Sequence, residues 1–163
     1  MTSRRRVTAS EPAAPVDLGC ACASARRLAR TLTQLYDRRL RDAGVEAPQF
    51  AILATLRQGP MSQTLVGRMH ALDKATVSRN LRVLERQGWI TTAVGDDSRT
   101  RQVALTPAGR TTLAKARAEW QDAQAELQSA MTSAQWRAMF ETFRAVTAAT
   151  QNLQRSARQR RQP

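Results

Sequence analysis

The chain has 163 residues and a formal net charge of +13, because 26 Lys and Arg side chains outnumber 13 Asp and Glu. This length suits one domain with its own core, and the excess of Arg predicts an anionic partner, either nucleic acid or an acidic membrane surface. No stretch of ~18 consecutive apolar residues occurs, which excludes a transmembrane span. The single His and the lack of a Gly-rich phosphate loop argue against an enzyme.

Residues 1–17 combine three consecutive Arg with a Pro- and Ala-rich stretch, and we expect a disordered basic arm. This segment lacks the ~7–15 apolar residues that a signal peptide needs, so the chain is expected to stay in the cytoplasm. From Cys20 to Ala43 apolar residues recur on one face of a helix, which Gly44 ends. Pro48 then opens a shorter, apolar helix.

Cys20 and Cys22 are the only cysteines, and they lie at the start of the first predicted helix. A thiol near a helix N-terminus is more reactive, so this pair is a candidate sensor of oxidants or of a thiophilic metal. The alternative is two small apolar side chains that pack in a cytosolic protein. Two ligands are too few for a closed zinc site, and His70, the only His, suits a surface or capping role better, so we predict no metal site and no cofactor.

Residues 61–88 predict two short helices joined by a short link, as in a helix-turn-helix. Ser62 is expected to cap the first helix, which turns Leu65, Val66 and Met69 inward. The second helix begins after Asp73 as N-cap and ends at Gly88.

The second helix of this pair is predicted to be sharply two-sided. At about 100° per residue, Val77, Leu81 and Leu84 form one narrow apolar stripe. The opposite face carries Arg79, Arg82 and Arg86. Such a helix suits the DNA major groove, where Arg pairs bidentately with guanine; the alternative is a solvated amphipathic helix.

Trp89–Ala93 and Arg101–Leu105 read as two strands around a turn at residues 95–98, which completes a winged helix-turn-helix. Thr106-Pro107 then starts a helix with heptad-spaced Leu, Trp and Ala, and a capping box at residues 132–135 starts the last helix. We therefore predict a mainly α fold with a small β-hairpin wing and long N- and C-terminal helices.

Three motifs lie at the places where this fold needs them: T-V-S-R at residues 76–79, D-S-R at residues 97–99, and L-T-P-A-G at residues 105–109. Over residues 18–155 the chain resembles the MarR (multiple-antibiotic-resistance-regulator) family. The resemblance implies a dimeric bacterial transcription regulator, usually a repressor, that binds palindromic operators as a homodimer. It also implies release by a small-molecule effector or by thiol modification.

The expected organisation is a basic arm (1–17), a single domain (18–155) and a frayed basic tail (156–163). Within the domain, residues 18–47 and 106–155 form dimerisation helices and residues 48–105 form the winged helix-turn-helix. A lobe of ~70 residues covers only part of such long helices, so a two-fold dimer is expected to bury the rest. The alternative is an intramolecular three-helix bundle.

The expected contacts with double-stranded DNA divide into base readers and backbone contacts. Arg79, with the methyl groups of Ala75 and Thr76, is placed at base edges, and Arg86 at phosphate. The other candidates for backbone contact are Ser62, Thr64, Lys74, Ser78, Asn80 and Arg82. The resemblance assigns Arg99 to the minor groove and Asp97 to the carboxylate that orients it, with Arg101 as a second candidate.

The resemblance also places effectors in a cleft between the dimer helices and the winged lobe. Tyr36, Phe50, Met61 and Met69 are candidates to line it, although each also suits an ordinary core position. The predicted function is thus sequence-specific regulation of transcription with no membrane partner. The alternative is a nonspecific or architectural DNA-binding protein.

Overall fold

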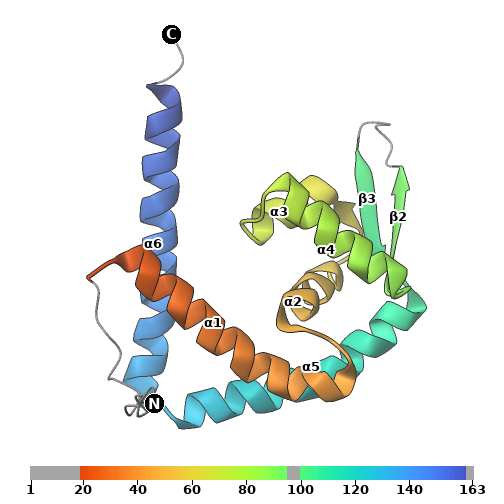
Figure 1. Cartoon of the computed structure of the whole chain (residues 1–163), viewed down its shortest axis with the longest axis horizontal. Coiled ribbons are helices and arrows are strands. Elements are labelled where there is room, and N and C mark those ends of the chain that lie inside the picture. The colour runs from red at the N-terminus through yellow and green to blue at the C-terminus, as the bar shows by residue number, and fades with distance from the viewer. Residues whose placement is uncertain (1–18, 95–99, 161–163) are drawn as a thin grey trace, which may run out of the picture.

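A computed structural model describes residues 19–94 and 100–160. Its elements, in chain order, are α1 (Ala21–Leu40), the 3-10 helix η1 (Arg41–Ala43), α2 (Ala47–Leu56), β1 (Met61–Ser62), α3 (Gln63–Met69), α4 (Lys74–Arg86), β2 (Ile90–Val94), β3 (Arg101–Leu105), α5 (Pro107–Ser129) and α6 (Ser133–Gln159) (Figure 1). The predicted fold class, mainly helical with a small wing and long terminal helices, is confirmed. No helix in these ranges is long and apolar enough to cross a membrane.

The wing is part of a three-stranded antiparallel sheet in the order β1-β3-β2. β3 has the predicted bounds and β2 begins one residue later than expected. β1, which was not predicted, pairs Met61 with Val103 on the other side of β3. Val103 therefore lies on the central strand, and its side chain is fully buried.

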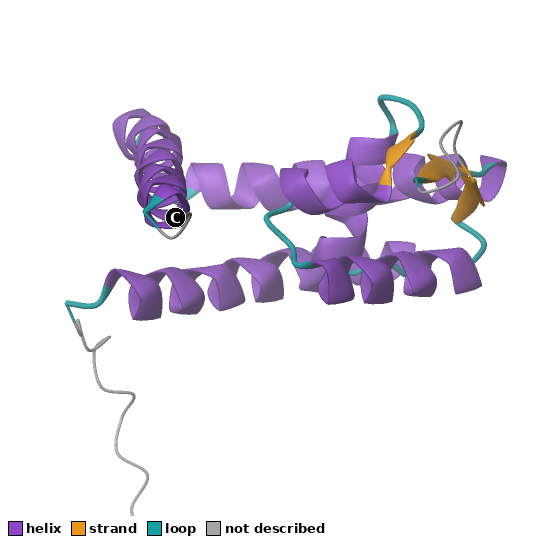
Figure 2. Cartoon of the chain, turned by 90° about the horizontal axis from the view of Figure 1, so that it is seen from above, coloured by secondary structure: helices purple, strands orange, loops and turns teal. Residues whose placement is uncertain are grey.

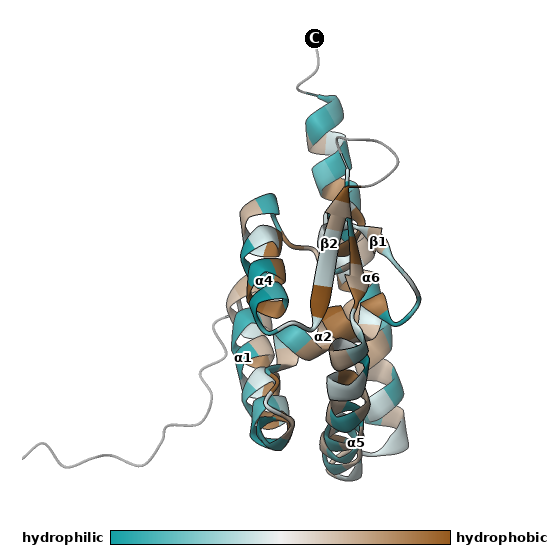
Figure 3. Ribbon diagram, turned by 90° about the vertical axis from the view of Figure 1, so that its right-hand side faces the viewer, coloured by the Kyte–Doolittle hydropathy of each residue, from teal (hydrophilic) through white to brown (hydrophobic). Residues whose placement is uncertain are grey.

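The core forms where α2 passes between the sheet and the other helices. Four of the ten residues of α2, Phe50, Ile52, Leu53 and Leu56, are buried. A short helix that is apolar on all sides is stable only in such a position. Figure 3 shows hydrophobic colour at α2 and hydrophilic colour along much of α4 and α1. We refer to residues 45–94 and 100–109 as the winged lobe, because they form this core with the ends of α1 and α5.

The predicted helix starts are confirmed by their capping hydrogen bonds. The side chains of Ser62, Asp73, Thr106 and Thr132 each accept a hydrogen bond from the backbone N–H three residues later. Each bond satisfies one of the N–H groups that a first helical turn leaves without a partner. Local sequence thus determines where α3, α4, α5 and α6 begin.

α1 and α5 lie side by side although they are far apart in the sequence (Figures 1 and 2). Arg39 of α1 forms an ion pair with Glu126 of α5, with 2.7 Å between Nη2 and Oε2. The Tyr36 hydroxyl donates a hydrogen bond to Gln124 of α5. Leu113, Ala116 and Ala123 are the buried positions of α5 beyond its first turn, and the two Ala allow a close approach of neighbouring helices.

α6 differs from the rest of the fold, because none of its residues is buried. The helix stands apart from the winged lobe (Figure 1), so the intramolecular three-helix bundle does not form. The prediction of a frayed tail from residue 156 is wrong, since α6 continues through Gln159. The inward placement of Met69 is also wrong: it lies in the last turn of α3, and its side chain is 51% exposed.

Candidate nucleic-acid interface

α4 carries its apolar and its basic residues on opposite faces, as predicted. Val77, Leu81 and Leu84 have relative exposures of 2%, 5% and 0% and anchor the helix to the core. The side chains of Arg79, Arg82 and Arg86 are exposed. The burial of one stripe thus fixes which face of the helix presents the guanidinium groups to solvent.

Asp73 holds the first turn of α4 through two contacts with Thr76. One carboxylate oxygen accepts from the Thr76 backbone N–H at 2.9 Å, and the other accepts from the Thr76 hydroxyl at 2.6 Å. These bonds, first of all the one from the hydroxyl, lower the pKa of Asp73. The Thr76 hydroxyl proton is therefore directed to Asp73, while Lys74 and Ala75 remain exposed beside it.

The angle between α3 and α4 depends on a close contact at Gly67. A Cβ atom at this position would lie 2.9 Å from the Cγ2 methyl of Val77. The link that follows α3 contains Ala71 with φ 52°, the left-handed conformation in which the backbone reverses. The Leu72 N–H then bonds to the Gly67 carbonyl at 2.9 Å and closes the turn.

His70 belongs to the scaffold of the helix-turn-helix. Its Nε2 lies 3.0 Å from the Thr55 hydroxyl oxygen, which itself donates to the Ala51 carbonyl at 3.0 Å. Since that hydroxyl has one proton, His70 Nε2 must donate to it. Burial lowers the pKa of His70. The ring thus ties the end of α3 to α2.

Cys20 and Cys22 are both exposed, with Cys20 at the N-cap of α1 and Cys22 in its first turn. The backbone of Cys20 is extended, and its side chain makes no capping hydrogen bond. In residues 19–94 and 100–160 no three His, Cys, Asp or Glu side chains gather closely enough to hold a metal ion. Both thiols are therefore accessible to solvent.

The L-T-P-A-G motif forms the junction between the wing and α5. The Thr106 hydroxyl donates to the Gly88 carbonyl at 2.6 Å and accepts from the Gly109 N–H at 2.9 Å. The Thr106 N–H donates to the Trp89 carbonyl at 3.0 Å. A Cβ atom on Gly109 would lie 1.9 Å from that carbonyl oxygen, so this position accepts only glycine.

The remaining candidates for DNA contact are distributed around α4. Ser62 uses its hydroxyl as the cap of α3, and Thr64 is exposed in the first turn of that helix. Ser78 and Asn80 are half-buried on the flanks of α4. Arg101 is exposed at the start of β3. Asp97 and Arg99 lie outside the described residues.

The four candidates for an effector cleft lie on different elements. Phe50 is buried in α2, where its ring stacks on Trp120 with 5.8 Å between ring centroids. Tyr36 is half-buried on α1, and burial raises its pKa. Met61 belongs to β1, and Met69 is half exposed at the end of α3. Among the four, Phe50 lines a described cavity, which α2 and α5 enclose.

Comparisons with known proteins support this architecture. A family model described as the MarR family matches residues 43–100. The M. tuberculosis transcriptional regulator MosR, solved in complex with DNA, is 32% identical, with a TM-score of 0.71; the match covers 80% of this chain and 98% of that one. The fold is shared with the PcaV transcriptional regulator of Streptomyces coelicolor, solved with its natural ligand, at 23% identity and a TM-score of 0.73; that match covers 84% of this chain and 99% of PcaV.

A curated relative is the uncharacterized HTH-type transcriptional regulator YwoH of Bacillus subtilis. It is 32% identical over 79 residues, which are 48% of this chain and 58% of YwoH. The match thus spans less than two thirds of that relative. The family model together with the nearly complete coverage of MosR shows that the chain belongs to the MarR family of transcriptional regulators.

Proposed function

We propose that this regulator binds a palindromic operator in double-stranded DNA as a homodimer and represses transcription from it. The observation that carries the proposal is the exposed row of Arg79, Arg82 and Arg86 on α4, a helix anchored by its other face and followed by a wing. Arg pairs bidentately with guanine O6 and N7 in the major groove. MosR, the relative solved with DNA, supports the same use of the fold.

The geometry of α4 supports a division of its contacts between bases and phosphate. Recognition helices read bases with their N-terminal residues, so Arg79 is assigned to base edges and Arg86, near the C-terminal end, to phosphate. Lys74 lies in the first turn, where the positive end of the helix dipole adds to the attraction for phosphate. Arg99 is assigned to the minor groove by the family motif, and Asp97, two residues earlier, to the carboxylate that orients it.

The homodimer is proposed from the apolar face of α6. Phe140, Phe143, Val146 and Leu153 have relative exposures of 38%, 38%, 52% and 69%. A helix with such a stripe normally buries it against a partner. A second copy is the economical occupant, because a two-fold dimer with its two α4 helices about 34–36 Å apart, one helical turn of DNA, would read both halves of a palindrome.

Release from DNA is proposed to follow a small-molecule effector or modification of Cys20 and Cys22. PcaV, which shares the fold, was solved with its natural ligand. The two cysteines of this chain are exposed at the start of α1, and α1 lies along α5. Effector binding or thiol modification would change the affinity for DNA through the helices that fix the position of the two winged lobes in the proposed dimer.

The test compares Arg79→Ala with Lys74→Ala on two duplexes at one fixed salt concentration. One duplex is a site enriched from random DNA by the wild-type protein, and the other is its scrambled sequence. Arg79→Ala should lose about 1–3 kcal/mol of binding free energy on the enriched site and little on the scrambled one. Lys74→Ala should weaken both alike, because phosphate carries no sequence information.

Fluorescence anisotropy titrations give the affinity of each of the two variants relative to wild type on each of the two duplexes. Light scattering of the free protein gives the number of chains in the assembly. Equal losses for both variants on both duplexes would contradict the division of contacts. A wild-type preference near one between the duplexes would favour the alternative, a nonspecific or architectural DNA-binding protein. A monomer in both the free and the DNA-bound state would contradict the dimer.

A further inference from the structure

The second half of α6 is a strongly basic surface. After Glu141 the sequence contains no Asp or Glu, and α6 with its C-cap carries Arg144, Arg155, Arg158 and Arg160 in this part. All four arginine side chains are exposed. This end of the helix therefore suits a partner that carries several negative charges.

The guanidinium groups at the end of α6 lie away from the apolar face that we assign to the second copy. At about 100° per residue, Arg155 and Arg158 lie roughly 160° and 140° around the helix from Leu153. The corresponding angles from Val146 are roughly 180° and 120°. Arg155 also donates a 2.9 Å hydrogen bond to the side-chain oxygen of Asn152, which orients the guanidinium group and leaves its charge in place. Burial of the apolar face in a dimer thus leaves these two arginines accessible to another partner.

α6 points toward the side of the molecule on which the wing ends. Its 27 residues span about 40 Å. Figures 1 and 3 both show α6 rising from the far end of α5 in the direction in which the β2-β3 hairpin extends. At that end of the hairpin β2 finishes at Val94 and β3 starts at Arg101. The C-terminal end of α6 and the open end of the hairpin therefore lie on the same side of the molecule.

The order of the elements across this side places α6 at the centre of the proposed complex. In Figure 1, α4 lies between α6 and the β2-β3 hairpin. In a two-fold dimer formed through α6, the wings then lie at the outer flanks of the operator. The two α6 ends lie near its centre, between the two half-sites that the α4 helices read.

We propose that the C-terminal end of α6 binds the DNA backbone at the centre of the operator. Arg155 and Arg158 form charge-assisted hydrogen bonds with phosphate oxygens, and Arg160 adds to the attraction. The C-terminal end of a helix carries about half a negative charge, which three guanidinium groups outweigh. The inference rests on the proposed function, because it requires a duplex bound to α4.

Phosphate contacts carry no sequence information. The end of α6 therefore raises the affinity for every sequence by the same factor, and it adds to the salt dependence of binding. It also fixes the position of the dimer along the duplex, while the choice of sequence stays with α4 and the wing.

The first experiment measures the affinity of Arg155→Gln/Arg158→Gln for the enriched and the scrambled duplex over a series of salt concentrations. The slope of log K against the logarithm of salt concentration should become smaller by about 2–4, because two arginines are removed from each of two chains. At about 0.1 M salt the affinity for both duplexes should fall by the same factor, roughly tenfold or more.

The matched control is Arg137→Gln/Arg144→Gln, the same change of charge nearer the start of the same helix. All four arginines lie within about 60° of one another around α6, so the two variants differ in position along the helix and not in the face they alter. The control should keep the salt dependence of wild type. Light scattering and the melting temperature should show that both variants remain folded dimers, so that a lost dimer is not mistaken for a lost DNA contact.

The second experiment locates the contact by hydroxyl-radical footprinting on the enriched duplex. Wild-type protein should protect the backbone at the centre of the site as well as in the two half-sites. Arg155→Gln/Arg158→Gln should lose the central protection and keep that of the half-sites, whereas Arg137→Gln/Arg144→Gln should keep both. Central protection that is unchanged in the first variant would overturn the proposal, as would a loss confined to the outer flanks.

The outcomes separate this inference from the proposed function. A wild-type salt slope in Arg155→Gln/Arg158→Gln, with the expected losses in Arg79→Ala, would overturn the role of α6 alone. Arg79→Ala that binds both duplexes as wild type does would contradict the proposed function. If Arg155→Gln/Arg158→Gln lost binding to phosphatidylglycerol vesicles and kept its affinity for DNA, an acidic lipid surface would be the partner, and the proposal would be wrong.

Discussion

The winged lobe and α6 differ in how much of their apolar surface is buried within one chain. The lobe places Val66, Leu84 and Val103 fully inside a core that its own helices and sheet enclose. α6 has 27 residues and buries none of them, although Phe140 and Phe143 lie on one face. The lobe is therefore complete within one chain, whereas α6 has an apolar face that one chain leaves in water.

α5 connects these two regions and shares the properties of both. Its first half is anchored in the core through Leu113 and Ala116, and Ala123 is buried farther along. Its last turns, after Ala123, contain no buried residue. α5 thus starts in the lobe and ends at the turn before α6, so it is the element that joins the two regions.

The largest effect is expected at the junction where the lobe meets α5. Gly109→Ala would place a Cβ atom 1.9 Å from the Trp89 carbonyl oxygen, and backbone cannot yield as a side chain can. We expect a loss of about 4 kcal/mol or more of unfolding free energy, an exceptional value for one methyl group. Urea unfolding followed by Trp fluorescence measures it.

Gly67→Ala makes the same change at a less constrained position and is the control for Gly109→Ala. Its Cβ would meet a side-chain methyl of Val77 at 2.9 Å, so the neighbour can move and the cost should be about 1–3 kcal/mol. Combining it with Val77→Ala should recover part of this loss. Equal destabilisation by Gly109→Ala and Gly67→Ala would show that the junction is not tighter than the helix-turn-helix.

Much of the lobe is predictable from its sequence, because its elements begin at residues with local capping roles. Asp73 and Thr106 cap helices through side chains that bond three residues ahead, and no tertiary contact is needed to recognise them. The stripe of Val77, Leu81 and Leu84 likewise follows from helical periodicity. The exposed basic side of α4 is the complement of that stripe.

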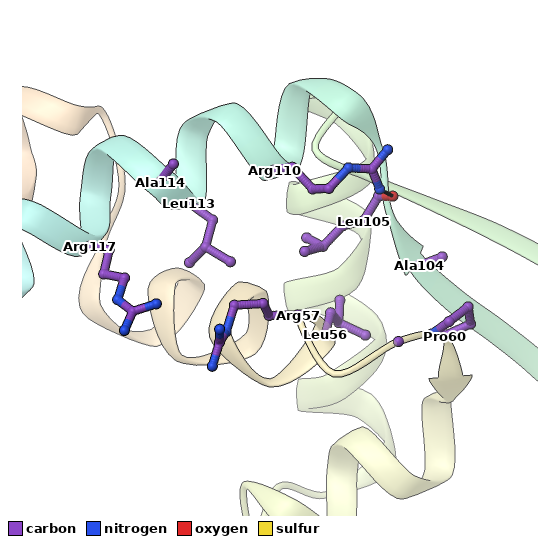
Figure 4. A pocket seen from close by; sticks show the side chains of 10 residues that line it. Leu56, Arg57, Pro60, Ala104, Leu105, Arg110, Leu113, Ala114 and Arg117 are labelled. Carbon is purple, nitrogen blue, oxygen red and sulfur yellow. Dashed lines mark hydrogen bonds between the residues drawn. The ribbon is translucent and has the colours of Figure 1, made fainter.

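Two of the features that were missed depend on contacts between distant segments. β1 is a two-residue strand, too short for any periodicity, and it exists because Met61 pairs with Val103. A cavity of about 470 Å³ (Figure 4) is lined by Arg57, the residue after α2, and by Arg110 and Arg117 of α5, and their spacing in the sequence carries no signal. Met69 has an apolar side chain in the predicted register, but α3 ends there and leaves it half exposed.

The second largest effect is expected for the double variant Phe140→Ser/Phe143→Ser on α6. If a second copy covers this face, removing two aromatic side chains should weaken the dimer by about 3 kcal/mol, roughly a hundredfold. The winged lobe should keep its unfolding midpoint in the monomer, because neither residue contributes to its core. Analytical ultracentrifugation over a concentration series measures the first quantity.

The control for this variant is Glu141→Ser/Arg144→Ser, two changes in the same stretch of α6 at exposed charged positions. It should leave the association constant within a factor of a few of wild type. A lobe that unfolds together with the loss of Phe140 and Phe143 would show that α6 belongs to the core of its own chain. The conclusion that the winged lobe is complete without α6 would then be wrong.

The smallest effect concerns the two helix ends that frame α4. After α3 the chain reverses at Ala71 with φ 52°, and after α4 it reverses at Gly88 with φ 71°. Both turns have the same pair of backbone bonds, from Ala71 and Leu72 in one and from Gly88 and Trp89 in the other. The left-handed conformation costs roughly 1–2 kcal/mol for a residue with a Cβ atom and little for glycine.

Ala71→Gly should therefore stabilise the lobe by about 0.5–1 kcal/mol, since relief of strain exceeds the added freedom of the unfolded chain. Gly88→Ala, which has open space around the new methyl group, should destabilise it by a similar amount. Urea midpoints of the two variants measure both changes against one wild type. The two turns have the same backbone geometry. If both substitutions changed the stability in the same direction, tertiary contacts of Ala71, and not its backbone conformation, would determine the effect at that position.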